Sequence, residues 1–249
     1  MKTVKDTLLQ RRSIRRYERQ PIPDDQLDFI FQAIRNTPTS YNGQQFSVID
    51  ITDPELKLRL YELTGQKQIK TCDHFLAFCA DFHKISLMAE NKGIDMPEIT
   101  KTADGLILGA VDASLAMMSA VTAACSLGLA TCCIGYARTA APQQTARLLN
   151  LPKGVWLVCG LAIGVPRELP DLKPKQPLQT VIHHNTYAPD ASLLENLTAY
   201  DSEITRYNST RSGSQTTNDW ASHIVSYYAE AMNYHMLDAL LAQGFDPER

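Results

Sequence analysis

Two periodicities of apolar residues alternate along the chain and predict a mixture of helices and strands. In residues 24–35, one face of a helix carries Leu27, Ile30, Phe31 and Ile34. Short runs rich in β-branched and aromatic residues predict strands instead. Helices are expected at residues 3–10, 24–35, 53–63, 104–127, 142–150 and 219–241. Strands are expected at residues 46–52, 75–82, 130–136 and 155–165. The mixture is typical of an α+β or α/β fold.

The expected helix at residues 104–127 is apolar on nearly all sides and rich in small residues. Such a helix must be covered all round, so it is either the central helix of the domain or a seam shared by two copies of the chain. The uncharged run from Ala113 to just beyond Tyr136 is long enough to suggest a membrane span. Because serines, threonines and glycines interrupt it, we interpret it as a buried helix followed by a buried strand.

Two later stretches lack this periodicity. Residues 166–189 are rich in proline, which predicts an extended connection across a surface. The stretch YNSTRSGSQTTND, residues 207–219, is polar and predicts a flexible loop.

Composition and charge limit the possible partners. The chain has 249 residues, of which 44% are hydrophobic, and a formal net charge of −3. A slightly acidic chain is not suited to bind nucleic acid. The N-terminus carries charges where an export signal needs an apolar segment, and the six cysteines show no CxxC spacing. We therefore expect a protein of a reducing, cytoplasmic compartment, outside the membrane.

Against this acidic background, the stretch QRRSIRRY at residues 10–17 places four arginines around one serine. Cations near a helix C-terminus are favoured by about 0.3–1 kcal/mol, which accounts for one or two of them. The remaining like charges repel one another. A guanidinium matches phosphate in bidentate geometry, and a serine hydroxyl adds a neutral donor. The pattern leaves a phosphate site and a purely structural role both open.

Sequence motifs for other kinds of site are missing. The chain has no GxxxxGK[ST] loop, GxGxxG turn, GxSxG elbow or HExxH helix, and GLAIG at residues 160–164 has the wrong spacing for a dinucleotide. The histidines lack metal-ligand spacing, so no metal is expected. A phosphate anchor without nucleophile, metal or proton relay suits an enzyme whose cofactor carries the chemistry.

Several short motifs, in order along the chain, resemble the nitroreductase family, and more closely its subgroup of flavin reductases and oxygen-insensitive NADPH nitroreductases with a long C-terminal extension. They are RRSIRRY at 11–17, PTSYNGQQF at 38–46, LTGQKQI at 63–69, CIGY at 133–136 and DLKPK at 171–175. The resemblance covers essentially the whole chain. It implies an intertwined homodimer and a three-layer α+β fold with a mixed, mainly antiparallel sheet flanked by helices. Residues 1–249 would form a single domain, with 166–249 as connection and C-terminal helical extension.

The same resemblance implies a noncovalently bound FMN at the dimer interface. Arg11, Arg12 and Ser13 would surround its phosphate and ribityl end, and Arg15 would lie by the pyrimidine edge. A positive charge there stabilises the reduced flavin and raises its reduction potential. The polar loop and Gln66 would hydrogen-bond the ring, and CIGY would approach its other side. The residues implied to bind FMN are Arg11, Arg12, Ser13, Arg15, Thr39, Ser40, Asn42, Gln44, Gln66, Cys133, Ile134, Gly135, Tyr136, Lys173 and Lys175.

Simpler interpretations exist for some of these residues. Lys173 and Lys175 are also compatible with a solvated loop, and residues 39–42 with an ordinary turn. The thiols beside the apolar strand, including Cys133, are expected to pack inertly rather than to react. Arg16 has no assigned ligand, and an external salt bridge is as good an expectation as any. Tyr41 is a weaker candidate to border the ring.

The implied activity is reduction of nitroaromatics, quinones or free flavin by NAD(P)H, with ping-pong kinetics and no protein nucleophile. Arg211 matches the position of the main arginine that binds the 2′-phosphate of NADPH in this subgroup. A second arginine would be expected around Thr216 and Thr217, so NADH remains open as cosubstrate. An FMN storage or redox-sensor protein, and a flavin-destroying or dehalogenating member of the same fold, are alternatives.

Overall fold

The computed structural model describes residues 2–247. The chain forms two compact units. The main unit comprises residues 1–168 and 235–249, and the extension unit comprises residues 169–234.

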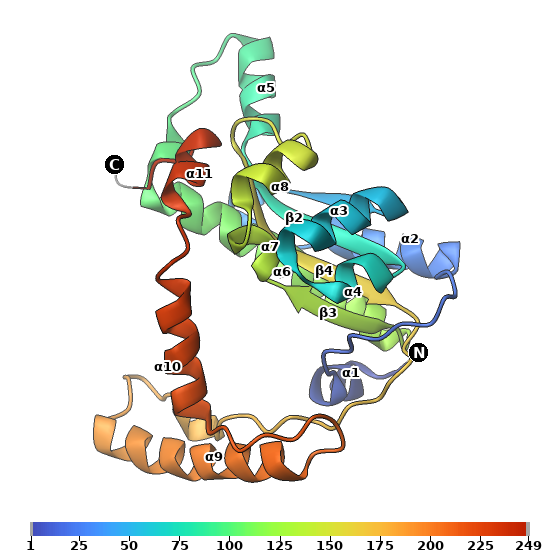
Figure 1. The fold of residues 1–249 in the computed structure, drawn as a ribbon. Helices are drawn as coiled ribbons and strands as arrows, with labels where there is room; N and C mark the ends of the chain where they lie inside the picture. Colours follow the sequence, from blue (N-terminus) through green and yellow to red (C-terminus); the bar gives the residue numbers. More distant parts are fainter. Residues whose placement is uncertain (1, 248–249) are drawn as a thin grey trace. The chain divides into compact units, whose positions relative to one another are not determined.

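A four-stranded sheet lies at the centre of the main unit, in the order β1-β2-β4-β3 (Figure 1). The strands are β1 (Phe46–Ile51), β2 (His74–Asp81), β3 (Ala130–Ile134) and β4 (Val155–Gly164). Neighbouring strands are antiparallel, and nearly every residue of the central strands β2 and β4 is buried. A parallel bridge between Ser13 and Thr131 continues the sheet beyond β3. The expected mainly antiparallel sheet is confirmed.

Helices cover both faces of this sheet. One core cluster joins α2 (Asp24–Arg35), α6 (Ala103–Ser126) and α11 (Leu237–Ala242) to one face. A second cluster joins α3 (Pro54–Thr64), α4 (Lys67–Thr71) and the segment after α1 (Val4–Gln10) to the other face, together with α7 (Tyr136–Thr139) and residues around α8 (Pro142–Leu148). The main unit is thus the expected three-layer arrangement of helices, sheet and helices.

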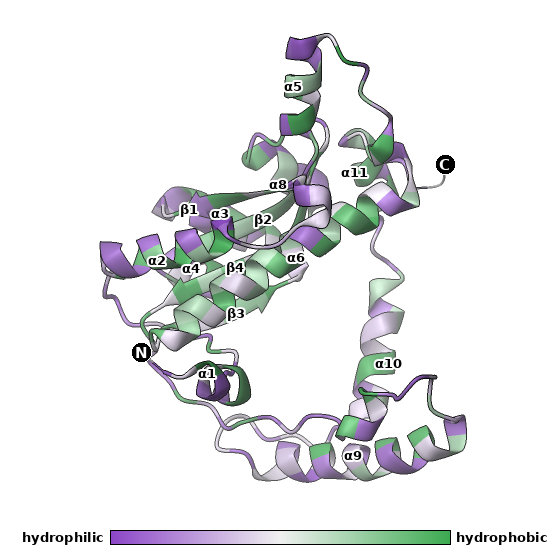
Figure 2. Cartoon of the chain, turned by 180° about the vertical axis from the view of Figure 1, so that it is seen from behind, coloured by the Kyte–Doolittle hydropathy of each residue, from purple (hydrophilic) through white to green (hydrophobic). Residues whose placement is uncertain are grey.

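The long helix α6 has one buried and one exposed apolar face. It begins where the Thr102 hydroxyl accepts the Gly105 N–H at 3.0 Å, and its buried face packs on β2, β4 and α2. By length and composition alone it would suffice to cross a membrane. The packing makes it a core helix instead, and Figure 2 shows it crossing the face of the sheet. An apolar stripe remains exposed along it, formed by Ile107, Val111, Leu115 and Met118.

The extension unit consists of an extended connection and two helices, α9 (Asp190–Thr210) and α10 (Trp220–Ala231). The rings of Tyr200 and Trp220 pack edge to face with centroids 5.7 Å apart. The loop between the helices is held by hydrogen bonds. The backbone carbonyl oxygen of Asn208 accepts the Thr216 N–H. The side-chain amide of Asn208 donates to the Asn218 carbonyl oxygen at 2.7 Å. Composition alone predicts no such order in this loop.

Two local predictions need correction, and several helices were not expected. The helix expected at 219–241 is two helices, α10 and α11, separated by turns at residues 232–236. The strand expected at 130–136 ends at Ile134, because Tyr136 already begins α7. Helix α9 was not expected, since only Tyr200, Ile204 and Asn208 are buried along it and its apolar periodicity is weak. The short helices α4, α5 (His83–Lys92) and α7 were also not expected.

Candidate functional site

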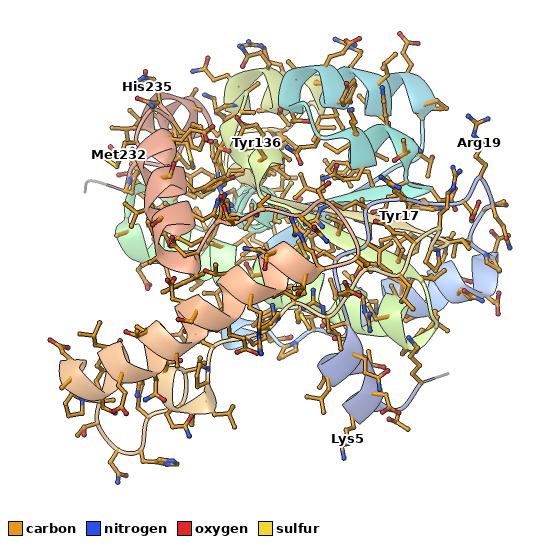
Figure 3. The ribbon with its side chains drawn as sticks, turned by 60° about the horizontal axis from the view of Figure 1, so that its bottom comes forward. Lys5, Tyr17, Arg19, Tyr136, Met232 and His235 are labelled. Atoms are coloured by element: carbon orange, nitrogen blue, oxygen red, sulfur yellow. The ribbon has the colours of Figure 1, made fainter. Side chains whose placement is uncertain are left out.

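The arginine segment, residues 11–17, is an extended chain beside the outer edge of β3. The N–H of Ile14 donates to the carbonyl oxygen of Thr131 at 3.0 Å, and Ile14 itself is buried. The hydroxyl of the buried Tyr17 donates to the Ile14 carbonyl, also at 3.0 Å. In Figure 3, Tyr17 lies within the unit whereas Arg19 points outward. Apolar anchors therefore fix this segment in place, and its arginines are left for other contacts.

The arginines of the segment have different surroundings. Arg16 is mostly exposed and its Nε lies 3.6 Å from Glu168, an external ion pair. The second Glu168 oxygen accepts the backbone N–H of Arg15 at 2.9 Å. The Nε of Arg11 is buried without a hydrogen-bond partner, and neither Arg11 nor Arg15 forms an ion pair within residues 2–247. Because an unpaired buried donor is costly, Arg11 indicates an anion that this part of the chain does not supply.

Arg12 and Ser13 lie between Arg11 and Arg15 in the arginine segment. The Nε of Arg12 donates to the carbonyl oxygen of Gln10 at 3.3 Å, so the side chain turns back toward the end of α1. Ser13 is partly buried and occupies the parallel bridge beside Thr131. The predicted phosphate-binding residues Arg11, Arg12 and Ser13 therefore sit on one continuous edge.

Gln66 joins this group through a chain of side chains. Gln68 of α4 donates to the Oε1 of Gln66 at 2.9 Å, and its side chain acts to lower the pKa of the Cys132 thiol on β3. The charge of Arg15 also acts on Cys132. The start of α4, strand β3 and the arginine segment are thus neighbours, as the predicted site requires.

The thiols of β3 are poor nucleophiles. The Cys133 side chain is exposed, yet desolvation by its surroundings, followed by the neighbouring thiols Cys159 and Cys132, raises its pKa to about 11, and the Arg11 charge opposes the shift. Burial likewise raises the pKa of Cys132 above its ordinary value, against the opposing charge of Arg15. Both thiols stay protonated near neutral pH, which argues against thiolate chemistry.

The chain passes from strand to helix at the end of β3. Ile134 is buried, Gly135 precedes α7 with φ −67°, and Tyr136 is the first residue of α7. A side chain at Gly135 would meet nothing within 4 Å. The φ angle of Gly135 does not require glycine. The open space beside the Gly135 Cα leaves room for a flat ligand.

The polar loop, residues 39–44, has an unusual backbone. Tyr41, Asn42 and Gln44 adopt φ values of 55°, 53° and 53°. Residues other than glycine rarely occupy this left-handed region, and clusters of them are typical of binding and active sites. The Gln44 N–H donates to the Thr39 hydroxyl at 3.1 Å, and the side chain of Tyr41 is 97% exposed. The loop is not an ordinary turn.

The strand register places the arginine segment and the polar loop at opposite corners of the sheet. Ser13 lies beside Thr131, in the row of the sheet where His74 begins β2. Phe46, which follows the polar loop, pairs with Ala80 near the other end of β2 and on the opposite edge of the sheet. At about 3.3 Å per residue and about 4.8 Å per strand, the separation is on the order of 20 Å. Both groups of one chain cannot touch the same small ring.

The extension unit carries the remaining predicted residues. Lys173 and Lys175 are exposed on its extended connection. Arg211 ends α9, and its Nε donates to the carbonyl oxygen of Ser214 at 2.6 Å. Close by, the Ser212 N–H and hydroxyl both donate to the carboxylate of Asp171, at 2.7 and 2.8 Å.

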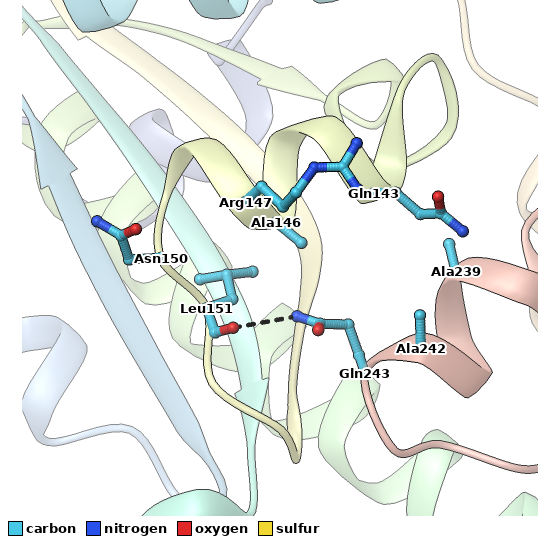
Figure 4. A pocket seen from close by; sticks show the side chains of 8 residues that line it. All are labelled: Gln143, Ala146, Arg147, Asn150, Leu151, Ala239, Ala242 and Gln243. Atoms are coloured by element: carbon cyan, nitrogen blue, oxygen red, sulfur yellow. Dashed lines mark hydrogen bonds between the residues drawn. The ribbon is translucent and has the colours of Figure 1, made fainter.

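A groove of about 520 Å³ lies elsewhere in the main unit, between α8 and α11 (Figure 4). Gln243 closes one side of it by donating to the Leu151 carbonyl at 3.5 Å. Its lining residues are Gln143, Ala146, Arg147, Asn150, Leu151, Ala239, Ala242 and Gln243. None of the predicted site residues belongs to this groove, so volume alone does not identify the candidate site.

Sequence reasoning did not single out three residues that the structure connects to the site. Glu168 holds the backbone of Arg15, Gln68 links Gln66 to β3, and Asp112 of α6 accepts the N–H of Ser40 at 3.2 Å. Only Asp112 had a visible signal, as a lone carboxylate in the middle of an apolar helix. The other two gain their role from tertiary contacts.

Comparison with known families agrees with this geometry. Residues 8–165 match the model described as "Nitroreductase family", and residues 173–248 match "Nitroreductase family, C-terminal domain". The chain is 38% identical over 250 residues to "FMN reductase [NAD(P)H]" of Bacillus subtilis (strain 168), covering all of both chains. It is 36% identical over 236 residues to "Oxygen-insensitive NADPH nitroreductase" of Salmonella typhimurium, with 94% of each chain covered.

Solved structures resemble the whole fold. The hypothetical oxidoreductase YcnD from Bacillus subtilis matches with a TM-score of 0.95 at 38% identity, with both chains fully covered. The NADPH:FMN oxidoreductase from Vibrio harveyi, solved with NAD+, matches with a TM-score of 0.87 at 27% identity and 98% coverage of each chain. With the two family models spanning nearly its whole length and these relatives alongside, the chain belongs to the nitroreductase family and is an NAD(P)H-dependent oxidoreductase.

Proposed function

We propose that this protein is an FMN-dependent reductase of nitroaromatics, quinones or free flavin that uses NADPH and acts as a cytoplasmic homodimer. The observation that carries the proposal is the buried Nε of Arg11, which has no partner in the described chain. It lies in an edge with Arg12 and Ser13, and these donors suit a phosphate group. Relatives named as FMN reductases support FMN as the source of that phosphate.

The chain's residues fit FMN at both of its ends. Arg11, Arg12 and Ser13 would hold the phosphate, and Lys173 and Lys175 stay predicted phosphate-binding cations. Gln66 and the backbone from Cys133 to Tyr136 would hold the ring. When bound, FMN supplies the chemistry of accepting a hydride from the nicotinamide and passing electrons to a second substrate.

Arg15 would adjust the electronic properties of the ring. Its guanidinium forms no ion pair with a carboxylate among residues 2–247, so its positive charge can act on a ligand beside Gln66 and Cys132. A cation near the pyrimidine edge favours the form that carries the negative charge. No protein nucleophile is needed, and the protonated thiols of β3 are consistent with that.

Two copies of the chain would be needed to complete one site. Because the polar loop lies on the order of 20 Å from the arginine segment in one chain, Thr39, Ser40, Asn42 and Gln44 would reach the flavin bound by a second copy. The exposed apolar stripe of α6 gives two copies a surface to bury: it is formed by Ile107, Val111, Leu115 and Met118. The stripe is therefore the seam that we assign to the homodimer.

NADPH is the favoured cosubstrate because Arg211 carries a guanidinium suited to a 2′-phosphate. Thr216 and Thr217 supply no second cation, so discrimination against NADH should be modest. A relative named for NAD(P)H and others named for NADPH are consistent with either cosubstrate. Since both substrates would use the same flavin in turn, the kinetics should be ping-pong.

The test is the visible absorption spectrum of the purified protein, followed by anaerobic addition of NADPH or NADH and then of a quinone or nitrofuran. We expect oxidised-flavin bands that bleach with either nucleotide, sooner with NADPH, and that return with the acceptor. A protein that takes up no FMN would refute the cofactor assignment. Bound FMN with negligible turnover would refute the reductase and favour a storage or sensor protein.

A further inference from the structure

Asp112 is an unusual residue for its position. It lies in the middle of α6, is 0% exposed, and is flanked in the sequence by Val111 and Ala113. One carboxylate oxygen accepts the Ser40 N–H at 3.2 Å, and the other is buried without a hydrogen-bond partner. A buried carboxylate costs several kcal/mol unless it is well paired. Packing alone therefore gives no reason for a carboxylate here.

The group that Asp112 contacts is the strained polar loop. Ser40 opens the turn in which Tyr41 and Asn42 adopt left-handed φ values. Within the loop, the Asn42 N–H donates to the Thr39 carbonyl at 3.2 Å and the Gly43 N–H donates to the Ser40 carbonyl at 2.9 Å. These bonds close the turn on itself, and the Asp112 contact ties its first residue to the core.

Two other contacts hold the ends of the loop but leave its centre free. Before the loop, the Thr37 hydroxyl donates to the Ser119 hydroxyl of α6 at 2.9 Å. After it, Lys84 of α5 donates to the carbonyl oxygens of Gln44 and Phe46, at 3.3 and 2.7 Å. Among these contacts, that of Asp112 reaches Ser40, the residue that opens the left-handed turn, whereas Lys84 holds Gln44 after the turn.

We infer that Asp112 is a positioning residue, which holds the polar loop in its left-handed form so that the loop can hydrogen-bond the flavin ring. The inference rests on the proposed function for the identity of the ligand, but the anchoring of the loop does not depend on it. Holding a strained loop before the ligand arrives lowers the ordering cost of binding. Asp112 acts through Ser40 and does not itself touch the flavin.

Five variants test the inference. Asp112→Ala removes the acceptor, whereas Asp112→Asn keeps an oxygen that can accept the Ser40 N–H. Ser40→Pro removes the N–H itself, and Ser40→Ala removes only the hydroxyl. Proline is compatible with the preceding residue, because Thr39 is extended with φ −136° and ψ 156°. Ser119→Ala is the matched control. It also removes a polar contact between α6 and the chain near the loop, but that contact is with Thr37, before the loop, and not with the turn itself.

Two measurements follow each variant. Hydrogen exchange of the Asn42, Gly43 and Gln44 amides in the FMN-free protein reports the loop itself. Titration of FMN fluorescence reports affinity. We expect D112A and S40P to speed exchange of these amides and to weaken FMN binding about ten-fold, equal to about 1.4 kcal/mol. D112N and S119A should stay within about three-fold of the unchanged protein in both measurements. S40A should leave the exchange of these amides unchanged and should bind FMN more tightly than S40P.

The outcomes separate the inference from the proposed function. If D112A matches S119A in both measurements, Asp112 does not position the loop. If D112N is as impaired as D112A, the carboxylate serves the core rather than Ser40, and the inference is wrong. If D112A does not fold, the difference between S40P and S40A in the same two measurements decides in its place. If the unchanged protein takes up no FMN, the proposed function fails, and exchange alone confirms or refutes the anchoring of the loop.

Discussion

The arginine segment and the polar loop, the two parts of the proposed site, differ in how they would hold a ligand. The segment is relaxed extended backbone that is bonded to β3, and charged side chains provide its binding capacity. The loop has a strained backbone with three left-handed residues, and a buried carboxylate and a lysine hold it in place. Charge binds an anion without precise shape, whereas a flat ring needs donors at fixed positions. Substitutions in the arginine segment should therefore change the FMN affinity and the reduction potential of bound FMN. Substitutions in the polar loop should change the backbone strain of the loop and thus the stability of the protein.

The largest effect is expected from Arg11→Ala. Hydrogen bonds to a charged group contribute about 1.5–3 kcal/mol, so FMN affinity should fall about 10- to 100-fold by fluorescence titration. The melting temperature of the FMN-free protein should not fall in parallel, because the Arg11 Nε has no partner there. Arg16→Ala is the control: its exposed ion pair with Glu168 should be worth at most about 1 kcal/mol. Equal losses of FMN affinity in both variants would contradict the assignment of Arg11.

Arg15→Ala should separate charge from affinity. With the cation removed, the reduction potential of bound FMN should fall by about 30 mV, equal to about 1.4 kcal/mol for a two-electron couple. Spectroscopic titration against a reference dye measures it. Arg15→Lys keeps the charge and should restore most of the potential. A variant Arg15→Ala with unchanged affinity and unchanged potential would remove Arg15 from the site.

The smallest effect concerns the strain of the loop. Tyr41 is exposed and left-handed, so Tyr41→Gly should relieve strain and raise stability by about 0.5–1 kcal/mol. At about 2–4 °C per kcal/mol for a chain of this size, the melting temperature should rise by a few degrees. Tyr228→Gly, in the interior of α10, should change stability in the opposite direction. A lower melting temperature for Tyr41→Gly would show that Tyr41 is not strained.

Sequence patterns predicted the elements of the main unit well where a helix buries one face or a strand is buried completely. The bounds of α2 match the expectation, and the four strands lie where apolar runs placed them. Prediction failed where contacts decide the structure. Nothing in residues 232–236 signals a break, yet the chain turns there, and beyond it Phe245 packs edge to face on Phe82 with centroids 6.1 Å apart.

The candidate site was predictable in part. The motifs RRSIRRY, PTSYNGQQF and CIGY gave the candidate residues, which stay a prediction, but not their arrangement. The register of the sheet separates Ser13 from the polar loop, and this separation is not visible in any one motif. Asp112 was visible as a lone carboxylate in an apolar helix, but its contact with Ser40 was not.

By itself, the sequence determined the family, the layered α+β fold and the chemical character of the site, because residue type sets apolar period, charge and hydrogen-bonding capacity. Only the tertiary structure decided which arginine lacks a partner, which carboxylate holds the polar loop, and that the two halves of the site lie apart in one chain. These facts depend on distances between residues far apart in the sequence, and local propensity carries no information about such distances.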